Sequence, residues 1–170
     1  MKDLNNNIIQ WADDKGILSN ATPLTQIKKT FEELTELITA LIDKNPEDVK
    51  DAIGDVNVTL IIVSKLAELK PSLEEIGKSN VFITANWIVE IFQKLARNKD
   101  ISIDVIRAQE ALNRLAKENG LTLEECTQSA YEVIAKRTGK LVNGVFVKDE
   151  KTTAPDKKNK RNISIDKEGK

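Results

Sequence analysis

The sequence predicts an all-α protein whose helices pack as a bundle in one domain. Apolar residues recur at every third or fourth position in several long segments, the pattern of helices with one face against a core. Serine, threonine, asparagine or proline stands where several of these segments begin, as is typical of helix starts. The alternation of apolar and polar residues that marks half-buried strands is nearly absent. With 170 residues, of which 40% are hydrophobic, the chain can form one domain with a buried core.

The first long helix is expected to begin after Thr22, with Pro23 in its first turn. Threonine can cap the unpaired N–H groups there, and proline is tolerated because its missing N–H would have no partner. An apolar face follows at helical spacing, formed by Leu24, Ile27, Phe31, Leu34, Ile38 and Leu41. A neighbouring stripe carries Gln26, Lys29, Glu33 and Glu36. This line of an amide, an ammonium and two carboxylates is more ordered than an ordinary solvated face.

The next helix is expected to begin after Asn45, with Pro46 at its first position and acids in its first turn. Pro71 is expected to end it. The segment 56–63 is apolar almost throughout, which is too apolar for a surface helix. Because the connecting turn is short, these two helices are expected to be antiparallel neighbours.

Further helix signals follow along the chain. A capping-box pattern at 72–75 predicts a short turn, and apolar periodicity predicts helices at about 80–97 and 103–118. Ser102 is expected to cap the latter helix and Gly120 to close it.

The last helix is expected to open with a second capping box at 122–125 and to run to about Thr138. A short extended piece is expected around the Asn143-Gly144 turn. The segment 151–170 is polar and rich in lysine, with no apolar periodicity, and predicts a disordered tail. The folded domain is therefore expected to span 1–150.

The composition excludes several classes of function. Lys and Arg number 26 against 27 Asp and Glu, so no charge excess indicates binding to nucleic acid. The absence of histidine excludes Ser-His-Asp triads, Cys-His pairs and most zinc sites. Cys126 is the only cysteine and is expected to be a buried, reduced side chain. Because no signal-like start or membrane-spanning apolar run is seen, we expect a soluble cytoplasmic protein without a membrane partner.

Most of the functional information lies in four acidic residues, Glu33, Glu36, Asp51 and Asp55. Each pair is three or four residues apart, so each pair lines one face of one helix. At about 1.5 Å per residue along two antiparallel helices, Glu36 and Asp55 lie at nearly the same height. Carboxylates facing a protein interior are costly unless a cation meets them, and Mg²⁺ or Mn²⁺ is the simplest candidate. Ion pairing with Lys29 or Lys50 is the alternative.

One helix carries Glu33-Leu34-Thr35-Glu36 and the next carries Asp55. This arrangement resembles the Mg²⁺-binding signature of the MazG-like branch of the all-α nucleoside triphosphate pyrophosphohydrolases, Glu-x-x-Glu followed by Glu-x-x-Asp. The chain departs from the signature at Ala52, where the family has a glutamate. Asp51 stands one residue earlier, in an Asp-Ala-Ile-Gly-Asp run similar to that of phage-type members, and Asp48 is the alternative on that face.

Two further blocks resemble the same family. Residues 11–17, followed by Gln26 and Lys29, are similar to its N-terminal nucleotide-pocket region. Residues 130–148 resemble the C-terminal segment of phage-type members. The three blocks occur in the family's order, whereas the segment 80–118 matches less clearly and is expected to be a helical insertion. The fold that the resemblance implies is a MazG-like helical bundle.

The resemblance implies a Mg²⁺-dependent enzyme, with Mn²⁺ as the alternative metal, that converts (deoxy)nucleoside triphosphates to monophosphates and pyrophosphate. A metal-activated water would attack the α-phosphorus. The implied metal ligands are Glu33, Glu36, Asp51 and Asp55. The implied catalytic residues are Glu32, Glu33, Glu36 and Asp55. The implied substrate-binding residues are Trp11, Gln26, Lys29, Tyr131, Arg137, Lys140 and Asn143.

The resemblance and the large apolar content also predict a homodimer or homotetramer. The type of match suits a phage-encoded protein that acts on nucleotides in the host cytoplasm. The base, the choice between ribose and deoxyribose, and the choice between triphosphate and diphosphate remain open. Ala52 favours one alternative, a catalytically inactive helical protein that binds nucleotide for regulation. A structural helical oligomer, whose acids pair with lysines, is the other.

Overall fold

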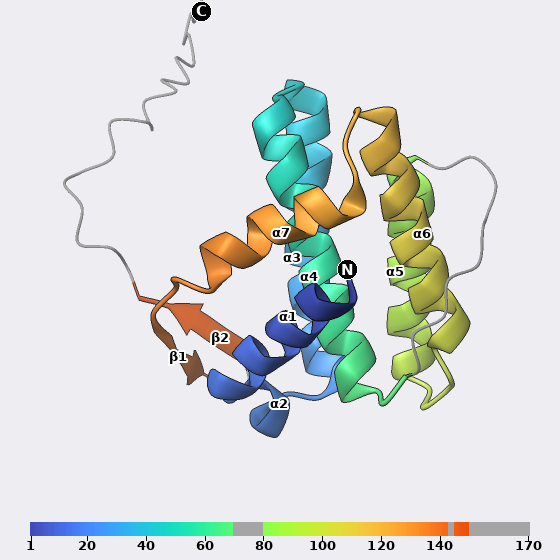
Figure 1. The fold of residues 1–170 in the computed structure, drawn as a ribbon. Helices are drawn as coiled ribbons and strands as arrows, with labels where there is room; N and C mark the ends of the chain where they lie inside the picture. The colour runs from blue at the N-terminus through green and yellow to red at the C-terminus, as the bar shows by residue number, and fades with distance from the viewer. Residues whose placement is uncertain (70–79, 143–144, 150–170) are drawn as a thin grey trace, which may run out of the picture.

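The computed structural model describes residues 1–69, 80–142 and 145–149, and these are mostly helical (Figure 1). The described helices are α1 (Lys2–Asp14), α2 (Ile17–Asn20), α3 (Pro23–Asp43), α4 (Pro46–Leu66), α5 (Val81–Leu95), α6 (Ser102–Glu118) and α7 (Leu123–Ile134). An antiparallel hairpin follows them, formed by β1 (Gly139–Val142) and β2 (Val145–Lys148). The predicted all-α class is thus confirmed, with one small hairpin added at the end.

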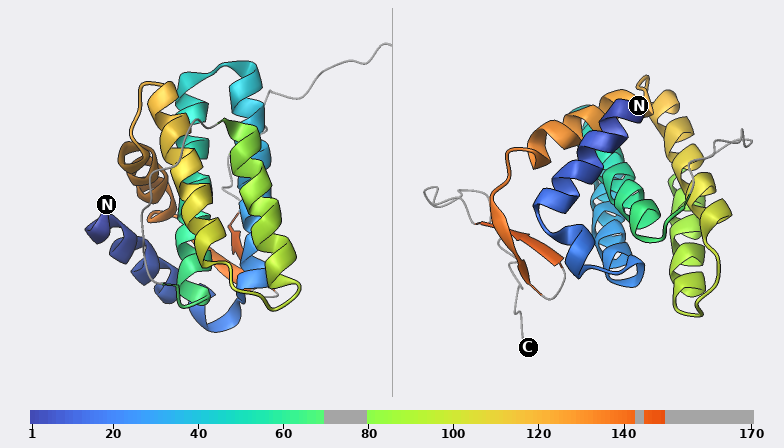
Figure 2. Two further views of the ribbon diagram at one scale, coloured as in Figure 1. Left: turned by 90° about the vertical axis from the view of Figure 1, so that its right-hand side faces the viewer. Right: turned by 60° about the horizontal axis from the view of Figure 1, so that its bottom comes forward.

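Helix α4 is the element around which the others are arranged. The neighbouring helix α3 runs antiparallel to it, as predicted, and α7 crosses it (Figure 1). The α5–α6 hairpin lies on one side of the α3–α4 pair, and α1 and the β-hairpin lie on the other (Figure 2). Every residue from Ala52 to Val63 is buried, so the prediction of a helix surrounded by its neighbours is confirmed.

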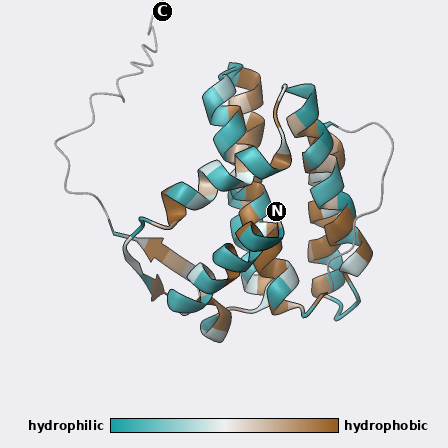
Figure 3. Cartoon of the chain, in the orientation of Figure 1, coloured by the Kyte–Doolittle hydropathy of each residue, from teal (hydrophilic) through white to brown (hydrophobic). Residues whose placement is uncertain are grey.

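The other helices have one apolar face each. Figure 3 shows hydrophilic and hydrophobic residues alternating along them, as expected for helices that turn one side to a core and the other to solvent. None of the described helices is long and apolar enough to cross a membrane.

Three predicted helix starts are confirmed. The side chains of Thr22 and Asn45 accept hydrogen bonds from backbone N–H groups in the first turns of α3 and α4. Thr122 and Glu125 form the predicted capping box of α7, in which the Glu125 carboxylate accepts a hydrogen bond from the Thr122 N–H at 2.9 Å. Each cap satisfies donors that the helix itself leaves unpaired.

The prediction that Ser102 caps α6 was wrong. Ser102 is the first residue of the helix, and the Asp100 carboxylate accepts a hydrogen bond from its N–H at 3.0 Å. A carboxylate is a stronger acceptor than a hydroxyl, so the residue two positions earlier takes the role. Gly120 follows the end of α6 with a φ of +73°, a left-handed conformation that suits glycine, as predicted.

Two helices end earlier than predicted. Helix α4 ends at Leu66 and not at Pro71, because Glu68 has a left-handed φ of 56° that terminates the helix. Helix α7 ends at Ile134 and not near Thr138, since the N–H groups of Lys136 and Arg137 bond to carbonyls three residues back and tighten the last turn.

Helices α1 and α2 were not predicted. Met1 provides no side-chain cap for α1, and only Leu4, Ile8 and Ala12 of this helix are buried. This stripe repeats every four residues within a polar run, so its apolar signal is weak. Helix α2 has only four residues, too few for any periodicity.

The extended piece expected near the end of the domain is the β1–β2 hairpin, in which Val142 pairs with Val145. The predicted turn at Asn143-Gly144 lies outside the described residues. The predicted turn at 72–75 and the predicted tail at 151–170 also lie outside them.

The crossing of α7 over α4 is unusually close at Gly54. A Cβ placed there would lie 2.0 Å from the carbonyl oxygen of Cys126 and 2.9 Å from the Cβ of Ala130. Cys126 is buried, as predicted, and burial raises the pKa of its thiol to about 11. Because the two backbones meet here, the end of α7 is carried toward the face of α4 that bears Asp55.

We expect Gly54→Ala to destabilise the protein by about 3 kcal/mol or more, because the added methyl group forces two backbones apart. The matched control is Gly120→Ala, where a Cβ would meet nothing within 4 Å. The control carries only the strain of its left-handed conformation, about 1 kcal/mol. Urea unfolding of the two variants measures both losses, and equal losses would contradict the close crossing.

Candidate functional site

A pocket of about 60 Å³ lies where α1, α3 and α4 meet the end of α7 and the β-hairpin. Six of the residues predicted for the site line it, namely Trp11, Gln26, Lys29, Glu33, Asp55 and Arg137. The remaining lining residues are Ile17, Val58, Thr59, Ile62, Ile134 and Phe146. Residues that are far apart in the sequence, and that were predicted from three separate blocks, are therefore brought together.

The acidic side of the pocket comes from α3 and α4. Glu33 is only 5% exposed and Asp55 only 9%, so these two carboxylates face the interior. Asp51 is half-buried one turn before Asp55 on α4. Glu32 and Glu36 are exposed on α3 and do not line the pocket. The four predicted metal ligands are thus neighbours, but only two of them are buried in the pocket.

Lys29 is the cation that Glu33 faces. Its ammonium lies 2.9 Å from the Glu33 carboxylate and 2.8 Å from that of Glu32. Burial lowers the pKa of Lys29, but the hydrogen bonds to Glu32 and Glu33 outweigh this effect and raise the pKa above its usual value. Part of the ion pairing that the sequence left as an alternative is therefore present, at Lys29.

Asp55 has no such partner. In the described part of the chain, its carboxylate accepts no hydrogen bond and makes no ion pair. Burial, followed by repulsion from Glu33 and Asp51, raises the pKa of Asp55 to about 7, although Arg137 opposes the rise. Burial also raises the pKa of Asp51, again against the effect of Arg137. The site concentrates negative charge that Lys29 and Arg137 only partly balance.

The donor set suits a hard divalent cation such as Mg²⁺. Glu33, Asp55 and Asp51 offer carboxylate oxygens alone, the ligands that Mg²⁺ prefers. The Lys29 ammonium, held by Glu33, occupies the position of a cation at these acids. As the side chains stand, no three acidic or cysteine side chains in the described ranges are grouped closely enough to hold a metal. Binding at Glu33 and Asp55 would therefore require Lys29 to move.

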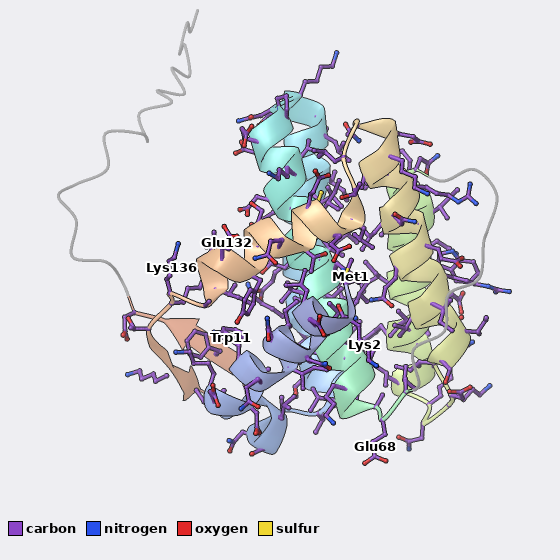
Figure 4. The ribbon with its side chains drawn as sticks, in the orientation of Figure 1. Met1, Lys2, Trp11, Glu68, Glu132 and Lys136 are labelled. Carbon is purple, nitrogen blue, oxygen red and sulfur yellow. The ribbon has the colours of Figure 1, made fainter. Side chains whose placement is uncertain are left out.

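The opposite wall is aromatic. The rings of Trp11 and Phe146 meet edge to face with centroids 5.8 Å apart and an interplanar angle of 71°. The indole nitrogen of Trp11 is buried without a hydrogen-bond partner among the described residues. Figure 4 shows Trp11 on the side of α1 that lies toward the β-hairpin. This wall combines a flat apolar surface with one unused donor, a combination that a planar heterocycle can satisfy.

Three predicted substrate-binding residues lie outside the pocket lining. Tyr131 packs against the apolar cluster beside α1, and Lys140 is exposed on β1. Asn143 lies outside the described residues. Lys136, a further basic residue at this end of the chain, is exposed and points away from α1 in Figure 4.

Sequence reasoning did not assign the apolar lining. Phe146 was noted only as part of a similar block, and no pattern indicated that it would face Trp11. Val58, Thr59 and Ile62 belong to a helix that is apolar all round, so its sequence does not tell which side lines a pocket.

Comparisons with known proteins add a phage relative. The chain is 36% identical over 76 residues to a protein of Haemophilus phage HP1 that is described as an uncharacterized 18.2 kDa protein in the rep-hol intergenic region. The match covers 45% of this chain and 47% of the phage protein, so it spans about half of each. No protein-family model matches the chain, and no solved structure matches it.

We expect the free energy of unfolding to fall as the pH rises from about 4 to 7. The pKa of Asp55 is raised to about 7 in the folded protein from a value of 3.8. The protonated form is therefore favoured by folding, and this stability is lost as Asp55 ionises. Since one pH unit corresponds to about 1.4 kcal/mol, the loss is on the order of 2–4 kcal/mol.

Urea unfolding between pH 4 and 8 in the presence of a chelator measures this loss. Asp55→Asn should flatten the curve and be more stable than wild type at pH 8, whereas Asp43→Asn, at an exposed position, should follow wild type. Parallel curves for wild type and Asp55→Asn would show that Asp55 is not the group responsible.

Proposed function

We propose that the protein is a Mg²⁺-dependent nucleoside triphosphate pyrophosphohydrolase of MazG-like type, with its active site at the pocket between α3 and α4. The substrates would be (deoxy)nucleoside triphosphates, and the products a monophosphate and pyrophosphate. A phage relative is in keeping with an enzyme of phage nucleotide metabolism.

The observation that carries the proposal is the gathering of unlike groups in one pocket. Two buried carboxylates, Glu33 and Asp55, lie beside two cations, Lys29 and Arg137, and the aromatic wall at Trp11 completes the lining. Acids and cations alone would suit a structural ion pair. Acids and cations beside an aromatic wall suit a ligand that has metal-bound phosphates at one end and a base at the other.

In this proposal Glu33 and Asp55, with Asp51 and Glu36 beside them, would hold Mg²⁺. When bound, the metal neutralises phosphate charge and makes the α-phosphorus more open to attack by water. Water adds to the α-phosphorus. The bond between this phosphorus and the oxygen that bridges the α- and β-phosphates then breaks, and pyrophosphate leaves with the electron pair of that bond. Glu32 is the carboxylate outside the metal set that we assign to accept the proton of the water.

The cations have a second task in this mechanism. With the Glu33 carboxylate engaged by a metal, the Lys29 ammonium would lose its partner there and could turn to phosphate. Arg137 can grip two phosphate oxygens at once, because its guanidinium presents a planar pair of donors. Positioning and charge stabilisation of this kind account for most of the catalysis of phosphoryl transfer.

The size of the pocket sets a condition on the proposal. A volume of about 60 Å³ holds a few water molecules, whereas small-molecule sites span roughly 300–1,000 Å³. A nucleotide must therefore open the pocket or lie partly outside it. The β-hairpin, which contributes Phe146 to the lining, is the element at its edge with the smallest connection to the bundle.

A nucleotide-binding protein without hydrolysis is the second candidate. Lys29 already neutralises Glu33, and Ala52, buried on α4, offers no carboxylate where the family signature has one. Both features favour a pocket that binds phosphate through cations alone.

We also propose a homodimer or homotetramer. Phe82 is 75% exposed on α5, and Val89 and Phe92 are exposed on the same helix. Their spacing places them along one side of α5, which forms an apolar strip that a second copy can cover.

The proposed activity is tested by pyrophosphate release from a panel of eight (deoxy)nucleoside triphosphates, with Mg²⁺, with Mn²⁺ and with a chelator. We expect metal-dependent release, and we expect Glu33→Gln and Asp55→Asn each to lower kcat by about 100-fold or more, because each removes a charge that holds the metal. The control is Glu132→Gln, an exposed acid on α7, which should retain activity. If no nucleotide released pyrophosphate, the proposed hydrolase activity would be contradicted, and the nucleotide-binding protein without hydrolysis would be the remaining candidate.

Trp11 reports binding separately from hydrolysis. In a Trp87→Phe background Trp11 is the only tryptophan, and we expect nucleotide with Ca²⁺ or Mg²⁺ to change its fluorescence, since its indole lines the pocket. Arg137→Ala should weaken this response by about tenfold, the loss of a charged hydrogen-bonding partner. Fluorescence that stays constant at saturating nucleotide would place the base elsewhere.

A further inference from the structure

A second, larger hollow lies elsewhere along α4. It is a groove of about 550 Å³ between α1, α4 and the start of α6, and none of the residues that line it lines the pocket described above. Its volume falls within the roughly 300–1,000 Å³ of small-molecule sites. Residue contacts explain why it exists: α1 and α6 each pack against α4 and have at most marginal contact with each other.

The groove combines apolar and polar residues. Its apolar lining residues are Met1, Ile9, Ile61, Leu69, Val105 and Ile106, and its uncharged polar ones are Asn5, Asn6, Ser64, Ser102 and Gln109. No aromatic side chain is found among the described lining residues, in contrast to the pocket beside Trp11. Aliphatic walls favour an alkyl chain, whereas a nucleobase gains most from an aromatic side chain on which it can stack.

The charge of the groove has one sign. Lys2 and Lys65 line it and are exposed, and none of its described lining residues is acidic. Figure 4 shows Lys2 at the start of α1, on the side toward α6. Lysines at the mouth of an apolar groove can lay their stems along its wall and present their charge to an anionic headgroup.

The wall of the groove on α6 is fixed by hydrogen bonds to the interior. Gln109 of α6 donates a hydrogen bond to Asn57 of α4 at 3.0 Å, and Asn57 donates to Thr127 of α7 at 2.8 Å. Asn57 and Thr127 are buried, so this chain ties α6 to the interior. A wall that is fixed before the ligand arrives lowers the entropy that binding must overcome.

We propose that this groove binds a small amphipathic anion with a single alkyl chain, of the fatty-acid class. The chain lies against the aliphatic walls on α1, α4 and α6, and the carboxylate meets Lys2 and Lys65 at the mouth. The site is separate from the proposed nucleotide pocket, so the two proposals stand or fall independently.

Calorimetric titration of the full chain with octanoate, decanoate and dodecanoate, each below its micelle concentration, tests the proposal. We expect saturable binding of one molecule per chain, with a Kd that falls by up to about fourfold for each added methylene. Dodecylammonium, with the same alkyl chain and the opposite charge, should bind at least about tenfold more weakly. Equal affinities for dodecanoate and dodecylammonium, or no saturable binding of dodecanoate, would overturn the proposal.

Variants locate the bound molecule. Lys65→Glu reverses an exposed charge and should weaken dodecanoate binding by about tenfold. Ile106→Glu places an acid in the half-buried wall and should weaken it further, with thermal melting as the check on folding. The control is Lys117→Glu, which makes the same change at an exposed position of α6 away from the groove. Wild-type affinity in Lys65→Glu and in a folded Ile106→Glu would overturn the proposal.

A nucleotide arm separates the two pockets. Thymidine monophosphate should leave dodecanoate binding unchanged, because the groove offers its base no aromatic side chain. Competition between them that Lys65→Glu abolishes would assign the groove to nucleotides and overturn the alkyl class.

Discussion

The burial of α4 is the constraint on which the rest of the structure depends. Its residues from Ala52 to Val63 have neighbours on every side, contributed by α3, α7, α6 and α1. Asp55 is therefore placed in the interior by the position of its helix, and its raised pKa follows from that position. Gly54, the residue before it, lets α7 cross at backbone contact, and the same crossing carries Arg137 into the pocket that Asp55 lines. One tight helix crossing thus creates the charged site and supplies part of its counter-charge.

The charged pocket and the aliphatic groove are lined by different residues of this helix. Asp55, Val58 and Ile62 line the charged pocket, whereas Ile61 and Lys65 line the aliphatic groove. A helix that is apolar all round would have no hollows beside it if its neighbours packed evenly against it. Here its neighbours leave space where α1 and α6 fail to meet, and where α7 gives way to a hairpin. The proposed functions therefore depend on how the neighbouring elements pack around α4 as well as on α4 itself.

The sequence predicted what local signals determine. Thr22, Asn45 and Thr122 mark helix starts that depend on neighbouring residues alone, and all three were found. The approach of the acids of α3 to those of α4 was also predictable, because two helices joined by a short turn have only one simple arrangement. The residue that lines the pocket with Asp55 is Glu33, however, whereas Glu36, which was predicted to lie level with Asp55, is exposed. The contact of Trp11 with Phe146 was not, since it joins residues 135 positions apart through a short hairpin. Helix α1 escaped notice for a related reason: its buried stripe is narrow, and the rest of it is polar.

The ion pair between Lys29 and Glu33 links stability to the proposed chemistry. A buried carboxylate with no partner is costly. Of the two buried carboxylates in the pocket, Glu33 is paired with the Lys29 ammonium and Asp55 is not. Burial of Asp55 raises its pKa to about 7, so that near neutral pH its carboxyl group is partly protonated. A divalent cation would relieve both residues at once, and it would release an ammonium beside the phosphates that accompany it. Of the two buried acids, Glu33 is paired with a cation and Asp55 is not. This difference distinguishes the site from a structural salt bridge, in which each acid already has its own base.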